Sequence, residues 1–146
     1  VDPDAPAPEG ARWFDLDRFA GPPRLQCWIC RCDDLENALV RFPRAGAPVT
    51  LSRGDLTWRM AVPETGVLPY DNVFPALMQW DGAAHPAERL TASGCSLARL
   101  VVSHPEAGDL ADLVGPVLRD DRIVFEKGAV GLRAELATPG GLRVLA

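Results

Sequence analysis

The sequence lacks the features that mark membrane, secreted or nucleic-acid-binding proteins. No apolar run approaches the roughly 18 residues that a membrane-spanning helix needs. The first ten residues have neither the charged start nor the apolar centre of a signal peptide. The fifteen lysines and arginines are scattered singly in a chain of net charge −5, so no basic stripe can follow a phosphate backbone. We therefore expect a soluble, cytoplasmic protein with no membrane or nucleic-acid partner.

Common catalytic motifs are also missing. There is no Ser-His-Asp order, no glycine loop of the phosphate-binding kind and no dinucleotide fingerprint. Only two histidines occur. His85 lies in a loop, where it could act as a general base, bind an anion or simply brace the turn. His104 stands just before a proline and is typical of a residue at the start of a helix, so neither histidine by itself assigns a reaction.

Cysteine is scarce outside one short segment. Three of the four cysteines lie in residues 27–32, CWICRC. The CxxC spacing of Cys27 and Cys30 would suit zinc or a redox pair. However, the segment alternates in the manner of a strand, in which residues three apart point to opposite faces. We expect small buried thiols in a reducing compartment, with a reactive Cys27 and a redox pair as the alternatives.

Length and turn content favour one domain built from short elements. A chain of 146 residues with 47% hydrophobic content can bury one core, which two small modules could share. Fourteen prolines and thirteen glycines predict frequent turns. We assign residues 1–23 to a proline-rich connector, 24–95 to a first module and 96–146 to a second. Because the chain starts at Val1 within the connector, we expect a further segment before it.

The first module should contain a strand, a helix and three further strands. Asp33 is the expected helix cap, with Glu36 in capping-box register. An apolar stripe of Leu35, Leu39 and Phe42 follows, and the helix should end near Pro43. The expected strands are residues 24–32, then a hairpin of 49–52 and 56–62, then 73–80.

The same order of elements returns after residue 96. Residues 97–104 predict a strand, and 106–118 carry apolar residues at helical spacing. Two further segments predict a second hairpin, 123–126 with 130–137, closed by a strand at 142–145. The fold class is therefore predicted to be α+β, with tandem βαβββ modules whose mixed, curved sheets form a cup and carry their helices on the outer face.

Several strings resemble one protein family. They are residues 33–36 (DDLE), 56–63 (LTWRMAVP), 79–82 (QWDG), 85–90 (HPAERL) and 93–95 (SGC). Together they resemble the bacterial glyoxalase-like domain proteins of the vicinal-oxygen-chelate superfamily, over residues 10–146. The resemblance implies a small-molecule ligand in the cup. It also implies another βαβββ module before the connector, so we expect this chain to lack that module, and either to associate with it or to form a homodimer.

Family members that catalyse reactions hold a divalent metal between a histidine on the first strand of a module and a glutamate on its last strand. The resemblance carries the histidine to Cys27 and, through the repeat, to Arg99. It carries the glutamate to Gln79 and into residues 142–145. A thiol and a neutral amide suit a hard divalent ion poorly. We therefore predict no metal site and no cofactor in this chain, so that a divalent metal would need ligands from outside it.

Four residues are candidates for ligand binding: Cys27, Arg59, Gln79 and His85. Strand alternation puts Arg31 on the same face as Cys27, and we expect that face to be the cup. Arg59 beside Gln79 could hold a carboxylate or carbonyl, because a guanidinium presents paired donors to planar oxygens. The alternative is a surface arginine.

Two bulky residues lie on the same strands as the candidate ligand-binding residues. Trp58 and Trp80 are expected to pack between the sheet and its helix, and the alternative is a platform on which a ligand stacks.

Two functions and one structural role remain open. The chain could bind, and also transform, a small oxygen-rich organic ligand, with glyoxalase, lyase or dioxygenase chemistry. It could instead sequester a ligand without changing it, as resistance-type members of the superfamily do, or serve only as a dimerising domain. Kinship at the level of the fold cannot choose among these. Catalytic residues are not assigned, and enzyme activity is left open.

Overall fold

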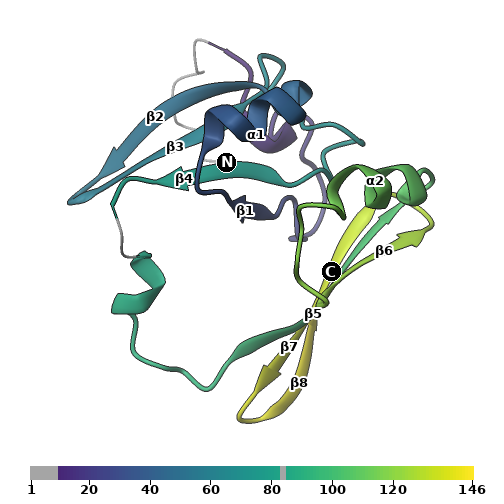
Figure 1. The fold of residues 1–146 in the computed structure, drawn as a ribbon. Coiled ribbons are helices and arrows are strands. Elements are labelled where there is room, and N and C mark those ends of the chain that lie inside the picture. The colour runs from purple at the N-terminus through teal and green to yellow at the C-terminus, as the bar shows by residue number, and fades with distance from the viewer. Residues whose placement is uncertain (1–9, 83–84) are drawn as a thin grey trace.

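A computed structural model describes residues 10–82 and 85–146. Two four-stranded mixed sheets each carry one α-helix (Figure 1). The first half contains η1 (Trp13–Asp15), β1 (Ile29–Arg31), α1 (Leu35–Arg41), η2 (Pro43–Ala45), β2 (Ala47–Arg53), β3 (Leu56–Val62) and β4 (Ala76–Trp80). The second half contains η3 (Pro86–Arg89), β5 (Ser96–His104), α2 (Ala107–Val114), β6 (Ile123–Lys127), β7 (Gly131–Thr138) and β8 (Gly141–Leu145). The α+β fold class is confirmed.

The first sheet has the strand order β1-β4-β3-β2, with β1 parallel to β4 and the other pairs antiparallel. The predicted β2–β3 hairpin is confirmed, and it pairs continuously from Ala47 and Val62 to Arg53 and Leu56. Strand β1 is shorter than the predicted strand over residues 24–32. The preceding residues make other contacts, such as the indole N–H of Trp28, which donates to the carbonyl of Val73 at 2.8 Å.

Helix α1 begins one residue later than predicted. Asp34, in extended conformation, is the N-cap, and its carboxylate accepts from the backbone N–H of Asn37 at 3.0 Å. Asp33 instead lies in solvent near Arg31. The predicted apolar stripe is confirmed, because Leu35 and Phe42 are buried and Leu39 packs against the core. The helix ends at Arg41, just before Pro43 as predicted.

The second sheet differs from the prediction. Its order is β6-β5-β7-β8, so β5 lies between a parallel β6 and an antiparallel β7. The predicted hairpin of β6 with β7 is therefore wrong, and β7–β8 is the hairpin. Residues 100–102 in β5 are all buried, which is typical of a central strand covered on both faces. The two halves share an order of elements along the chain but not an order of strands in the sheet.

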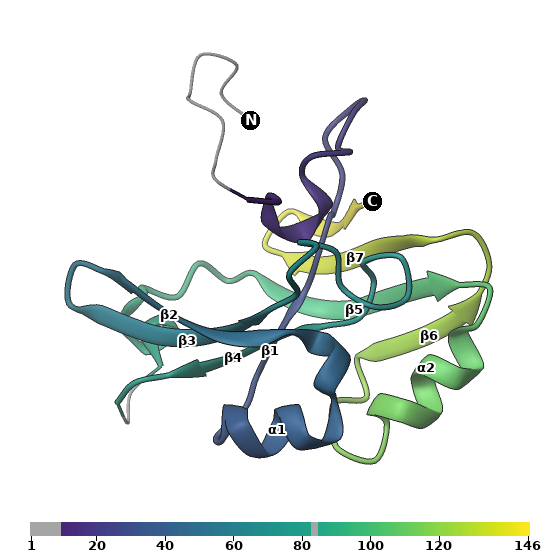
Figure 2. The same cartoon turned by 90° about the horizontal axis from the view of Figure 1, so that it is seen from above.

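One hydrophobic core spans both halves. It contains Leu35, Phe74 and Leu77 from the first half together with Val102 and Leu110 from the second. Helices α1 and α2 lie side by side on the same side of the two sheets (Figure 2). In the described part of the chain, no helix is long and apolar enough to cross a membrane.

The segment before β1 also takes part in this core. Trp13 and Phe14 pack against it, although residues 1–23 were assigned to a proline-rich connector outside the two modules. The first nine residues of that connector lie outside the described part. Whether the chain divides into modules at residues 24 and 96 stays a prediction.

A left-handed turn lies between β3 and β4 in the first half. Tyr70, Asp71 and Asn72 have φ values of 54°, 51° and 74°. The buried side chain of Asn72 holds this turn by donating to the carbonyls of Phe14 and Gln26 and by accepting from a backbone N–H. Such a conformation is costly for residues other than glycine, so the side-chain bonds must offset it.

His104, at the end of β5, lies against this turn. Its Nδ1 accepts from the backbone N–H of Glu106 at 3.0 Å. The neutral ring therefore carries its proton on Nε2, which lies 3.1 Å from the Asp71 carboxylate. His104 thus braces the contact between the halves and the chain that leads into α2.

Candidate functional site

Two of the predicted site residues meet at the start of α1. Arg59 on β3 is directly opposite Gln79 on β4. The Oε1 atom of Gln79 accepts from the Arg59 guanidinium and from the backbone N–H of Leu35, each at 2.8 Å. Glu36 pairs with the other end of the guanidinium. Because both partners of the Gln79 atom are donors, that atom must be oxygen, and the amide nitrogen of Gln79 is left to donate elsewhere.

These contacts correct the expected orientation of the sheet. Arg59 and Gln79 share a face, as predicted, but it is the face covered by α1, because both side chains reach that helix. Arg31 and Trp80 belong to the opposite face by strand alternation. Trp58 is directly opposite Trp80, and their ring centroids are 5.2 Å apart. The tryptophans therefore lie on the face away from α1, not between the sheet and the helix as expected. On the α1 face, Gln79 instead supplies the acceptor that the first backbone N–H groups of the helix need.

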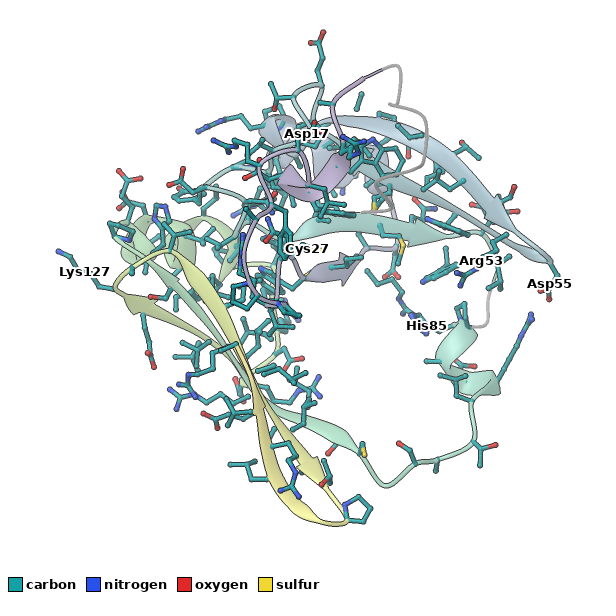
Figure 3. All side chains as sticks on the ribbon, turned by 180° about the vertical axis from the view of Figure 1, so that it is seen from behind. Asp17, Cys27, Arg53, Asp55, His85 and Lys127 are labelled. Atoms are coloured by element: carbon teal, nitrogen blue, oxygen red, sulfur yellow. The ribbon has the colours of Figure 1, made fainter. Side chains whose placement is uncertain are left out.

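A hollow of about 360 Å³ lies at the end of β4, beyond the last residue of β1. It is lined by Arg31, Cys32, Asp33, Gln79, Trp80, Gly82 and His85. Two predicted residues, Gln79 and His85, therefore meet in one place, and Arg59 lies one hydrogen bond behind them. Cys27 is not among the lining residues, and it lies well apart from His85 (Figure 3).

His85 has a defined role in local structure. Its Nδ1 accepts from the backbone N–H of Ala87 at 3.1 Å, and the Glu88 carboxylate accepts from the backbone N–H of His85. The two contacts form a capping box at the start of η3, so the alternative in which His85 braces the turn is confirmed. Because Nδ1 is an acceptor, the neutral ring carries its proton on Nε2 and has one outward donor.

Segment η3 is tied to the tip of the β2–β3 hairpin. Arg89 forms an ion pair with Asp55 at 2.5 Å. Figure 3 shows His85 close to this tip, which carries Arg53 and Asp55. The edge of the His85 ring lies against Trp80, with centroids 5.8 Å apart. These contacts hold the histidine at the hollow.

Arg31 and Trp80 line the hollow but were not among the four predicted ligand-binding residues, although Arg31 was expected on the cup face and a stacking platform was the alternative for Trp80. The guanidinium of Arg31 is half exposed, and its nearest carboxylate, on Asp33, is 3.9 Å away. The indole N–H of Trp80 is buried and has no acceptor among the described residues. A buried donor without a partner is unusual in a folded protein. The hollow is lined by three residues that carry N–H donors, Arg31, Gln79 and His85, and by the Asp33 carboxylate.

The positions at which the family resemblance would place metal ligands do not fit a divalent ion. Burial raises the pKa of the Cys27 thiol above its usual value, which favours the protonated form. Arg99 is a cation that pairs with Glu126 at 3.0 Å, and the oxygen of Gln79 is already engaged by two donors. The transfer to Arg99 and residues 142–145 also loses its basis, because the two sheets differ in strand order. Over residues 10–82 and 85–146, no three His, Cys, Asp or Glu side chains are grouped as metal ligands would be.

Comparison with known proteins supports one family. A family model described as a glyoxalase-like domain matches residues 1–118, which span the first half and continue through α2. No curated protein matches the chain, and no solved structure does. The two mixed, curved sheets agree with the fold of this family. The chain therefore belongs to the glyoxalase-like domain family of the vicinal-oxygen-chelate superfamily.

Proposed function

We propose that this protein binds a small oxygen-rich organic ligand, such as a hydroxy acid or another carboxylate, in the hollow beside β4. The observation that supports the proposal is that residues carrying N–H donors come to the hollow from separate elements: Arg31 from β1, Gln79 from β4, and His85 from the start of η3. Membership in the glyoxalase-like family adds the expectation of a small-molecule ligand.

Three of the lining residues have a defined task in this proposal: Arg31, Gln79 and His85. Arg31 would pair with a carboxylate, because charge-assisted bonds to a guanidinium are strong and directional. The amide nitrogen of Gln79 and Nε2–H of His85 would donate to a carbonyl or hydroxyl oxygen. Arg59 would act as a positioning residue, since it fixes which end of the Gln79 amide faces away from α1.

The first experiment is a thermal-shift screen of hydroxy acids, aldehydes, catechols and antibiotics. A ligand at a hundred times its Kd stabilises the folded state by about 2.7 kcal/mol, which raises Tm by several degrees. Arg31→Gln should abolish the shift. His85→Asn should weaken it while keeping the cap on η3, because asparagine is also a good N-cap. Arg143→Gln, an exposed arginine on β8, is the control and should leave the shift unchanged.

The proposal fails if no compound class shifts Tm, or if a shift survives both Arg31→Gln and His85→Asn. Any compound that binds should then be incubated with the protein and followed by NMR, because formation of a product would show that the ligand is transformed as well as bound. Metal analysis of the purified protein completes the test. A stoichiometric divalent metal would contradict the prediction that this chain holds no metal site.

A further inference from the structure

A second and larger cavity lies between the two helices. It is a cleft of about 690 Å³ bounded by α1, the edge strand β1 and the chain that follows α2. Its apolar lining includes Phe42, Phe74 and Leu77 from the first half, and Val114, Val117 and Leu118 from the second. The cleft adjoins the hollow beside β4 only at residues 31–33. Its volume is in the range of small-molecule pockets.

The lips of this cleft are apolar and in contact with water. Val40 on α1 is 83% exposed, and Val117, after the end of α2, is 52% exposed. Both valines line the cleft. Apolar surface that is left exposed on both sides of a concave site favours an apolar occupant, because its burial removes that surface from water.

One end of the cleft is cationic. Arg41, in the last turn of α1, places its guanidinium 5.5 Å from the Phe42 ring, and a guanidinium N–H reaches the carbonyl of Leu113 at 3.5 Å. No carboxylate of the described residues forms an ion pair with Arg41. At the opposite end Asp34 caps the helix, and Asp33 faces Arg31. A single negative charge is therefore best placed beside Arg41.

We infer that this cleft is a binding site for a small organic anion with an apolar body. The body would lie on Phe42 and Leu77, and the acidic group would lie beside Arg41. The cleft would recognise a negative charge and an apolar body in one ligand, whereas the hollow is proposed to recognise small, oxygen-rich compounds. The inference does not rest on the proposed function, since the two cavities use different side chains for recognition.

The probe for the test is 1-anilinonaphthalene-8-sulfonate, which has an aromatic body and one sulfonate. The folded protein should bind it saturably at one site, with a blue shift and a rise in fluorescence. Ala38→Phe, on the α1 wall of the cleft, should fill the site and abolish binding. Ala129→Phe, in an exposed turn, is the matched control for an added phenylalanine and should leave binding unchanged.

The charge is tested separately. Arg41→Gln should weaken binding of the sulfonate probe at least fivefold, whereas Arg53→Gln, on the far end of the β2–β3 hairpin, should not. Uncharged N-phenyl-1-naphthylamine should bind wild type and Arg41→Gln about equally. If Ala38→Phe fails to fold, Val117→Glu changes an exposed residue and places a repelling charge on the lip, so it should also weaken sulfonate binding at least fivefold.

The inference is overturned if the folded protein does not bind the sulfonate probe, or if neither Ala38→Phe nor Val117→Glu changes binding. It is also overturned if sedimentation shows a dimer in which probe binding falls as protein concentration rises. In that case a second copy of the chain covers the cleft. Near-UV circular dichroism on each variant confirms that the probe reports on the native state.

Discussion

The contact between Gln79 and the start of α1 gives the sharpest test of how the first sheet is oriented. Replacing Gln79 by leucine keeps the size of the side chain but removes the oxygen that accepts from Leu35 and Arg59. A neutral hydrogen bond contributes about 1 kcal/mol and a bond to a charged group about 1.5–3 kcal/mol. Because Arg59 is partly exposed and retains Glu36, we take the low end for the second bond. Gln79→Leu should therefore lower the free energy of unfolding by about 2–3 kcal/mol.

Urea unfolding, followed by the fluorescence of the four tryptophans, measures this change, and Tm should fall by roughly 5–10 °C. Gln79→Glu keeps the acceptor and should stay within about 1 kcal/mol of wild type. A double-mutant cycle with Arg59→Leu should give a coupling of about 1–2 kcal/mol. If Gln79→Leu is as stable as wild type, or if the coupling is zero, Arg59 and Gln79 do not meet on the α1 face and the assignment of faces is wrong.

Three further outcomes concern turns, core and thiols. Gly46 has a φ of 111°, and a Cβ there would come within 2.1 Å of the β3 backbone, so Gly46→Ala should lower the free energy of unfolding by more than about 3 kcal/mol. Gly54→Ala, at φ 62° in open space, should cost only about 1 kcal/mol, and equal Tm losses for the two variants would contradict the steric argument. Leu110→Ala empties a fully buried site and should cost about 3–4 kcal/mol in urea unfolding; a loss below about 1 kcal/mol would mean that α2 is not anchored there. Burial raises the pKa of Cys30 to about 11, so the neutral thiol persists well above pH 8. Alkylation of Cys30 by iodoacetamide, followed by mass spectrometry, should therefore speed up about tenfold per pH unit up to about pH 11. Cys95, which is exposed, should react first. A Cys30 rate that does not depend on pH would refute this.

Local sequence pattern predicted most elements because each buries one stripe or one face. Leu35 and Phe42 marked the apolar side of α1, and alternation through residues 56–62 marked β3. The pattern could not show which strands pair. Residues 123–126 and 130–137 follow each other closely and predicted a hairpin, yet both segments pair with β5 instead. The buried run over residues 100–102 was the available signal, since a strand that is apolar on both faces belongs in the centre of a sheet.

The candidate site was predicted in part. Alternation placed Arg59 and Gln79 on one face, which the structure confirms, but it could not show which face carries the helix. That choice depends on a backbone N–H of α1 that needs an acceptor, a requirement that periodicity does not reveal. Arg31 and Trp80 were not chosen as ligand-binding candidates because the hollow forms where β1 stops and β4 continues. That offset is set by strand register, which the sequence of either strand alone does not specify.

The central place of β5 has a consequence for how the chain folds. Both of its neighbours come later in the sequence, one through a helical crossover and the other after a still longer excursion. The β7–β8 hairpin can form by itself, but the other two ladders of that sheet cannot close until β5 is in position. The same strand supplies Val102 to the core shared with the first half. Order in one half thereby depends on order in the other, and the two should be acquired in a single cooperative step instead of one after the other.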